Sequence, residues 1–265
     1  FSMTIYVQRL YGPIVTLGTE YINIKNTKPM IDKVQKILEN RDSILGGVID
    51  WSDVKGKINF VNVYFKYKDK WILHNFTMEV SENTITGIIG ENGSGKSTLI
   101  KLLSKLCAPQ SGAIYLDGIP IEKITYESLK KYIAVIPQDN FLPYGSLKNI
   151  MGISSGEKEE EMYRLMRRLG LSLEKFPKGL DTEISENMGN LSGGEIQKLS
   201  LIRGLLQNKK IYILDEPTSA MDLESEKAFC SIVKEYLDNK TVLIISHRQE
   251  ILSVCDDIIR ISDEM

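Results

Sequence analysis

The sequence predicts an α/β protein whose core is a mostly parallel sheet, and two patterns indicate it. Short, continuous apolar runs alternate along the chain with segments of helical periodicity. Apolar runs without polar alternation are typical of strands buried on both faces, and the helices between them supply the cover. Ligands bind such sheets beyond the carboxyl ends of the strands, and the most informative residues of this sequence fall at those ends.

The expected elements begin after a helical N-terminal part. A strand is expected over residues 58–65, where Ile58, Phe60, Asn62 and Tyr64 alternate with the residues between them. Further strands are expected at 84–89, 133–136, 211–214, 241–245 and 258–261. Helices are expected at 97–106, 157–169, 196–206 and 224–237. Strands and helices that alternate in this way make up the predicted parallel sheet and its cover.

The N-terminal part contains an amphipathic helix, expected over residues 28–42. Its apolar residues Ile31, Val34 and Leu38 recur at helical spacing, so one face needs a surface to lie against. Two interpretations remain open: the helix packs on its own domain, or it connects the domain to a preceding one. No uncharged stretch approaches the ~18–20 apolar residues that span a bilayer.

Length and charge exclude several classes of protein. The 265 residues suffice for one large or two small domains, and 42% hydrophobic content excludes a disordered or collagen-like chain. Lys and Arg number 33 against 35 Asp and Glu, a net charge of -2, which argues against a nucleic-acid binder that depends on positive charge. Three scattered cysteines form neither a disulfide framework nor a zinc motif.

A glycine-rich segment, residues 90–98, lies between an expected strand and an expected helix. It matches the pattern G-x-x-x-x-G-K-[ST] at Gly90, Gly95, Lys96 and Ser97. The glycines let successive backbone N–H groups point inward, and the helix N-terminus adds partial positive charge. Lys96 then supplies a full charge to the β- and γ-phosphates, and the Ser97 hydroxyl is a ligand for Mg²⁺. The residues expected to bind phosphate are Gly90, Asn92, Gly93, Ser94, Gly95, Lys96, Ser97 and Thr98.

Two adjacent acids, Asp215 and Glu216, follow the expected strand at 211–214. Acids at the end of a buried strand are costly to leave unpaired, and a divalent cation accounts for them. We expect Asp215 to hold Mg²⁺ and Glu216 to act as the general base that polarises the attacking water.

A second segment suited to anions has the sequence Leu-Ser-Gly-Gly-Glu at residues 191–195 and opens a helix. Ser192 is a favourable N-cap residue, and the two glycines are expected to leave the helix N-terminus bare. One chain would thus carry two helix N-termini suited to phosphate binding but one metal-binding acid. We therefore expect a head-to-tail dimer, with each ATP between the Lys96 loop of one chain and the Ser192 loop of the other. The second loop contributes Ser192, Gly193, Gly194 and Glu195.

These motifs together resemble the nucleotide-binding domain of ABC (ATP-binding cassette) transporters over residues 51–265. The family signature is matched at 191–195, with Glu195 where glutamine is more usual. The resemblance implies a P-loop NTPase (RecA-like) core, an antiparallel β subdomain, and an α-helical subdomain over about 139–208 that carries the signature. It also implies that residues 1–50 are the end of a transmembrane helix and a connector.

The resemblance assigns roles to four further residues. Gln138, after the expected strand at 133–136, resembles the glutamine that senses the metal and the γ-phosphate. His247 resembles the switch histidine that contacts the γ-phosphate, and Asp222 ends a dimer-contacting segment. Tyr67 resembles the aromatic residue that stacks on adenine. The expected catalytic set is Glu216, His247 and Gln138, and the expected metal ligands are Ser97, Gln138 and Asp215.

The implied function is ATP hydrolysis that powers export through ATP-dependent dimerisation. Residues 182–186, Thr-Glu-Ile-Ser-Glu, resemble a segment of exporters, and the resemblance extends to half-transporters of the peptide, bacteriocin and multidrug type. It implies ATP and Mg²⁺ as cofactors, and as partners an identical or paralogous second domain and the transmembrane domain of the same transporter, with no nucleic acid. The implied location is the cytoplasmic face of the membrane. The alternatives are an importer ATPase subunit and a soluble, non-transport ABC ATPase.

Overall fold

The computed structural model describes residues 47–139, 141–154, 156–185 and 191–261, together with eight helical residues of the N-terminal part. The chain divides into two units, Phe1–Gly46 and Gly47–Met265, and every strand of the described residues belongs to the second. The helix expected over residues 28–42 lies, apart from Lys28, outside the described residues. In the part of the chain that is described, no helix combines the length and apolar character needed to cross a membrane. The eight N-terminal residues are Pro13, Thr16, Leu17, Glu20, Tyr21, Lys25, Thr27 and Lys28.

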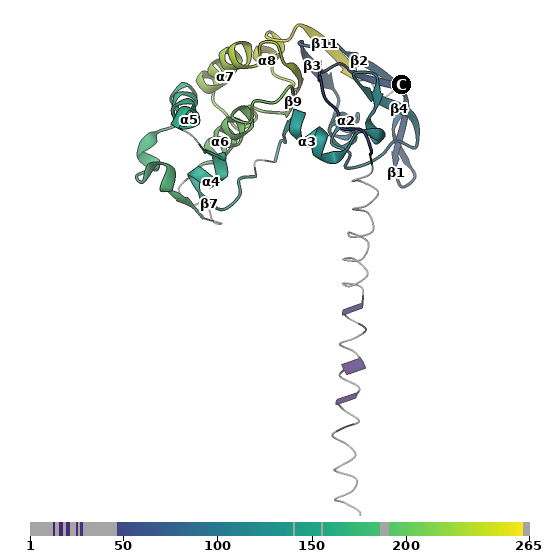
Figure 1. Ribbon diagram of the computed structural model, residues 1–265, viewed down its shortest axis with the longest axis horizontal. Helices are drawn as coiled ribbons and strands as arrows, with labels where there is room; N and C mark the ends of the chain where they lie inside the picture. The colour runs from purple at the N-terminus through teal and green to yellow at the C-terminus, as the bar shows by residue number, and fades with distance from the viewer. Residues whose placement is uncertain are drawn as a thin grey trace, which may run out of the picture. The chain divides into compact units, whose positions relative to one another are not determined.

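A five-stranded parallel sheet forms the centre of the larger unit, as the apolar runs predict (Figure 1). Its strand order is β11-β3-β10-β9-β6, so successive strands along the chain are separated by crossovers. Ile245 of β10 lies in register beside Ile88 of β3 and Asp215 of β9, so these three strands end at about the same edge of the sheet. The strands are β3 (Ile85–Gly90), β6 (Ile133–Ile136), β9 (Ile211–Asp215), β10 (Thr241–Ile245) and β11 (Asp257–Ile261).

The parallel sheet separates two hydrophobic cores. In β9, Ile211 and Ile213 face one core, whereas Tyr212 and Leu214 face the other, and all four are at most 1% exposed. Such two-sided burial explains why the strand is an unbroken apolar run instead of an alternating one. By the same period of two, Asp215 follows Ile213 onto the face that is covered by helix α2 (Lys96–Leu103).

The antiparallel β subdomain is confirmed, as a four-stranded sheet of order β2-β1-β4-β5. Strict alternation over residues 58–65 is wrong, because burial shifts from Ile58 and Phe60 to Val63 and Phe65. The cause is a bulge: the register with β2 shifts after Phe60, and Asn62 has a left-handed φ of 48°. The strands are β1 (Ile58–Tyr67), β2 (Lys70–Val80), β4 (Ser111–Leu116) and β5 (Ile119–Pro120).

The remaining helices lie mostly between β6 and β11. The α-helical subdomain expected over about 139–208 contains α4, α5 and α6 and a two-stranded antiparallel sheet of β7 (Gly145–Ser146) and β8 (Glu183–Ile184) (Figure 1). Helix α2 ends three residues before the expected position, because Lys105 takes a left-handed φ of 53°. The helices are α3 (Tyr126–Tyr132), α4 (Leu147–Met151), α5 (Gly156–Arg168), α6 (Gly193–Leu205), α7 (Leu223–Tyr236) and α8 (Gln249–Leu252), with 3₁₀ turns η1 (Ile121–Lys123), η2 (Leu173–Lys175) and η3 (Gly179–Asp181).

Residues 47–50, expected with the N-terminal part, pack within the larger unit. Ile49 forms a parallel bridge with Ile124, and the Trp51 backbone N–H donates to Ser128 Oγ at 2.7 Å. Trp51 is 1% exposed and its ring meets Tyr132 edge-on, at 5.7 Å between ring centroids. This short segment is therefore fixed to α3 before the first strand begins.

Candidate functional site

The glycine-rich loop curls between β3 and α2 at the carboxyl edge of the sheet. Gly93 and Gly95 have φ values of +92° and +97°, a conformation that favours glycine. A Cβ on Gly95 would come within 2.9 Å of Leu73 Cδ2, so a larger residue would also require this leucine to shift. Gly95 is the N-cap of α2 and supplies no side-chain cap. The first N–H groups of the helix therefore point toward the loop without a capping side chain, which is the donor arrangement that anions bind.

Two side chains of the loop indicate an anionic ligand. The Lys96 ammonium folds over the loop and donates to the carbonyl oxygens of Gly90 and Glu91, at 2.6 and 2.7 Å. Ser94 is 3% exposed, and its hydroxyl has no hydrogen-bond partner in the described part of the chain. Buried polar atoms are nearly always paired, so this hydroxyl fits a loop that closes around an acceptor. The residues present thus fit a phosphate chain.

Asn92 and Thr98 occupy different environments within the same segment. Asn92 is exposed at the loop, whereas Thr98 is 5% exposed within α2. Within the expected phosphate-binding set, Asn92, Gly93 and Ser97 are exposed, whereas Ser94, Gly95 and Thr98 are buried.

Asp215 ends β9 opposite the start of α2 and is 8% exposed. Burial raises the pKa of its carboxyl and the Glu216 charge raises it further, whereas the Lys96 charge and a hydrogen bond with Ser97 lower it. The net direction is upward. A carboxylate beside a hydroxyl offers the hard oxygen ligands that Mg²⁺ prefers, so these two side chains fit such an ion.

Glu216 has an unusual backbone conformation, with a φ of 45°. Its N–H donates to the Ile245 carbonyl at 2.9 Å, and its own carbonyl accepts from the Ser219 N–H at 3.1 Å. A non-glycine residue in the left-handed region costs energy and persists only where its surroundings fix it, commonly at functional sites.

The two side chains after β10 face the Glu216 carboxylate. His247 Nε2 lies 3.8 Å from Glu216 Oε1, too far for a hydrogen bond, and the histidine side chain is half exposed. The Ser246 hydroxyl donates to Glu216 Oε2 at 3.4 Å. The structure therefore brings Glu216 and His247 together, as the sequence predicts.

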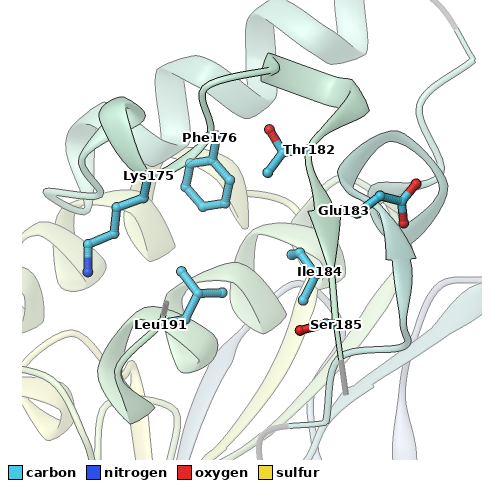
Figure 2. A pocket seen from close by; sticks show the side chains of 7 residues that line it. All are labelled: Lys175, Phe176, Thr182, Glu183, Ile184, Ser185 and Leu191. Carbon is cyan, nitrogen blue, oxygen red and sulfur yellow. The ribbon is translucent and has the colours of Figure 1, made fainter. Parts of the chain in front are cut away.

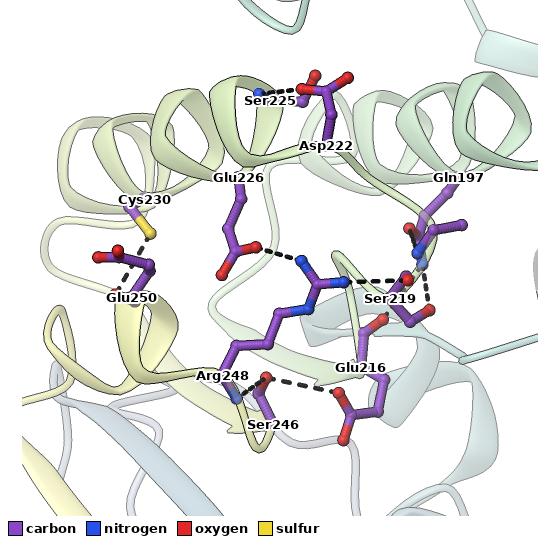
Figure 3. A network of polar contacts seen from close by, with 11 residues as sticks. Gln197, Glu216, Ser219, Asp222, Ser225, Glu226, Cys230, Ser246, Arg248 and Glu250 are labelled. Carbon is purple, nitrogen blue, oxygen red and sulfur yellow. Dashed lines mark hydrogen bonds and ion pairs between the residues drawn. The ribbon is translucent and has the colours of Figure 1, made fainter.

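A buried glutamine, Gln197 in α6, links the signature helix to the Glu216 turn (Figure 3). Its amide nitrogen donates to the Glu216 carbonyl and to Ser219 Oγ, at 3.1 and 3.0 Å, and its oxygen accepts from the Ala220 N–H at 2.9 Å. It is 1% exposed. Sequence reasoning missed this residue, because a glutamine beside Lys198 near the start of a helix is expected to face solvent.

Arg248 makes a second set of links that the sequence did not indicate (Figure 3). Its guanidinium pairs with Glu226, which is 2% exposed, and donates to the Ser219 carbonyl at 3.1 Å. Its backbone N–H donates to Ser246 Oγ at 3.2 Å. The segment that carries His247 is thus connected to α7 and to residues 216–222.

The signature segment is capped, which corrects the expectation of a bare helix N-terminus. Ser192 Oγ accepts from the Glu195 N–H at 3.3 Å, and Glu195 Oε2 accepts from the Ser192 N–H at 2.8 Å. This reciprocal capping box occupies two of the N–H groups, while the remaining ones stay at an exposed tip. A Cβ on Gly194 would lie 2.6 Å from the Ala220 carbonyl, but one on Gly193 would meet nothing within 4 Å. Packing within the chain accounts for Gly194 and not for Gly193.

Three predicted site residues lie apart from these contacts. Gln138 is exposed two residues after the end of β6, and the charge of its neighbour Asp139 acts on Asp215. Tyr67 is 43% exposed at the end of β1, with Lys101 Nζ 5.3 Å from its ring centroid. Asp222 caps α7 by accepting from the Ser225 N–H at 2.8 Å, which lowers the pKa of its carboxyl.

Comparisons with known proteins agree with this geometry. The family model described as ABC transporter matches residues 73–219. ATP-binding cassette sub-family B member 6 of Mesocricetus auratus is 31% identical over 97% of this chain and 31% of its own length. Leukotoxin translocation ATP-binding protein LktB of Mannheimia haemolytica is 30% identical over 95% of this chain and 36% of its own length. The chain thus spans about a third of the length of these relatives.

A solved structure shows the same fold. It is the structure of a bacterial Atm1-family ABC exporter with ATP bound, with a TM-score of 0.74 and 28% identity over 97% of this chain and 46% of that chain.

Proposed function

Because this chain belongs to the ABC transporter family, we propose that it is the ATP-hydrolysing domain of an exporter. The observation that carries the proposal is the meeting of the Lys96 loop with Asp215 and Glu216 at one sheet edge. One of the two relatives is named a leukotoxin translocation ATP-binding protein, and the solved exporter structure has ATP bound. The same chemistry would serve an importer subunit or a soluble ABC ATPase, but the similar proteins include a translocation protein and an exporter.

Nucleotide binding is assigned to the loop and to one aromatic residue. The N–H groups of residues 90–98 and the Lys96 ammonium bind the β- and γ-phosphates. Tyr67, half exposed at the end of β1, offers a ring face on which adenine stacks. Ser97 and Asp215, with Gln138 contributing, would hold Mg²⁺, which would supply positive charge to the phosphates.

Hydrolysis is assigned to residues at the ends of β9 and β10. Glu216 accepts a proton from the attacking water, and the left-handed backbone fixed by Gln197 and Ile245 keeps its carboxylate at this edge. His247 lies close enough to Glu216 to contact the same phosphate group. Electrostatic stabilisation and positioning supply most of the rate enhancement in such phosphoryl transfer.

A second domain of this kind completes each site. The signature tip is exposed, and among the described residues no hydrogen bond or ion pair joins it to the Lys96 loop of the same chain. Gly193, which packing within the chain leaves unexplained, allows another backbone or a phosphate to approach the tip closely. The tip therefore binds the nucleotide held by a neighbouring domain, identical or paralogous, and Asp222 lies at the same contact.

The membrane partner is the transmembrane domain of the same transporter, and the domain acts at the cytoplasmic face of the membrane. ATP draws two domains together, hydrolysis releases them, and the membrane domains convert this cycle into export. The cargo is chosen by the membrane segments, and the peptide or multidrug class is the expectation from sequence.

Glu216→Gln tests the proposal directly. This variant should bind MgATP, hydrolyse it at least ~100-fold more slowly, and accumulate as a dimer that sedimentation velocity detects. Addition of Lys96→Ala to the same chain serves as the matched control and should abolish the dimer. A Glu216→Gln protein that releases phosphate at the wild-type rate, or stays monomeric at saturating ATP, would overturn the assignment.

A further inference from the structure

The signature glutamate is bridged by a lysine from the α-helical subdomain. Lys175 Nζ lies 2.8 Å from Glu195 Oε1 and 2.9 Å from Oε2, so the ammonium contacts both carboxylate oxygens. The same Oε2 accepts from the Ser192 N–H and from the Ser192 hydroxyl, at 2.8 and 3.0 Å. Three donors thus converge on one carboxylate at the tip of α6.

The carboxylate at this position is ionised. Partial burial would raise the pKa of Glu195, but hydrogen bonds from Lys175 and Ser192 outweigh it and hold the pKa below its ordinary value. Glutamine, the usual residue of the family at this place, carries no charge. This chain therefore places a full negative charge in the first turn of the helix whose tip, in the proposed function, meets phosphate.

That charge opposes the proposed role in two ways. A carboxylate near a triphosphate repels it, and like charges across an interface suppress association. A cation that holds and neutralises the carboxylate reduces both effects.

Lys175 is held at the right place by the packing of η2. Phe176, the next residue, is 5% exposed, and its N–H donates to the Leu173 carbonyl at 3.0 Å. Figure 2 shows the Phe176 ring between Lys175 on one side and Ile184 on the other, above Leu191. These side chains line a cavity of about 20 Å³, room for about one water molecule, so the packing under the lysine is close.

We propose that Lys175 is a positioning residue for the nucleotide site shared between two domains. It neutralises Glu195 and fixes this carboxylate in the capping box, so that the exposed tip of α6 accepts the phosphates of the neighbour's ATP. The inference rests on the proposed function, in which a glutamate in the signature requires a cation to neutralise its charge.

The test measures the ATP concentration that gives half-maximal dimer in the Glu216→Gln chain, by sedimentation velocity. Lys175→Met in this background should raise that concentration about five- to tenfold at low salt. The increase should shrink in high salt, because the uncompensated charge is screened. Lys178→Met, a change at an exposed lysine of the same subdomain, is the matched control and should shift it less than about twofold.

A second substitution separates charge compensation from simple attachment of η2 to α6. Glu195→Gln added to Lys175→Met removes the uncompensated charge and should recover most of the loss, although the ion pair is absent. A double variant as weak as Lys175→Met would show that Lys175 acts only as a structural tie, and an unshifted Lys175→Met would also overturn the proposal. A Glu216→Gln parent that does not dimerise would instead overturn the proposed function, and this inference with it.

Discussion

The phosphate loop and the signature tip are both helix N-termini, yet they are built in opposite ways. The loop before α2 lies at the end of a buried strand, and no side chain caps its helix. The tip of α6 is exposed, and Ser192 and Glu195 cap it locally. An uncapped end beside a lysine is prepared for a strongly bound anion within the chain, whereas a capped, exposed end is stable alone and can bind a ligand that a second molecule brings.

Nucleotide binding should be far more sensitive to substitution in the phosphate loop than at the signature tip. Lys96→Ala removes the full charge that completes the loop, and loss of such a charge-assisted contact costs about 3 kcal/mol, or more than ~100-fold in affinity. Fluorescence titration with labelled ATP measures the change. Wild-type affinity in this variant would remove the distinction between the two ends.

A substitution in the signature tip of α6 should abolish activity only at the site that this tip shares with a second chain. Chains carrying Lys96→Ala or Ser192→Arg alone should be inactive, whereas their mixture should recover ATPase activity from one intact composite site. Because Ser192 also caps α6, Ser192→Ala is the control that removes the cap without adding bulk. Full activity of the Ser192→Arg protein alone would show that the tip takes no part.

The connection between α6 and the turn at Glu216 depends on Gln197. Gln197→Leu keeps the size of the side chain, but it leaves the Ala220 N–H without its partner and removes one of the two donors to the Glu216 carbonyl. We expect a loss of about 2–3 kcal/mol in stability and a Tm lower by roughly 4–10 °C, followed by differential scanning calorimetry. Glu195→Gln, two residues earlier and partly exposed, should change Tm far less. An unchanged Tm in Gln197→Leu would mean that the hydrogen bonds of Gln197 in Figure 3 add nothing to stability.

The smallest effect concerns the exposed cap of α7. The hydrogen bond from Ser225 lowers the pKa of Asp222, so the ionised side chain stabilises the folded state at a pH above its ordinary value of 3.8. Asp222→Asn should lower the urea midpoint slightly at pH 7, and the difference should shrink as the pH falls below that value. A difference that grows on acidification would contradict the sign.

Much of the fold could be predicted because its signals are local. Unbroken apolar runs mark β6, β9 and β10, whose bounds differ from expectation by at most one residue. The loop glycines and Lys96, and the pair Asp215 and Glu216, are adjacent in sequence, so spacing alone identifies them. Glycines, a lysine and carboxylates at the ends of strands permit few alternatives to a phosphate-binding site.

Other features depend on neighbours distant in sequence, and only the tertiary structure decides them. The bulge at Asn62 shifts which residues of β1 are buried, because the pairing partner, and not the composition of the strand, sets the register. Gln197 and Arg248 look like ordinary surface residues until folding places them against residues 216–220. By itself the sequence determined which chemical groups stand at each strand end. The packing of α6 and α7 against β9 and β10 decided which side chains hold those groups in place. The reason is that hydrogen bonds between distant segments form only once the sheet and its helices have assembled.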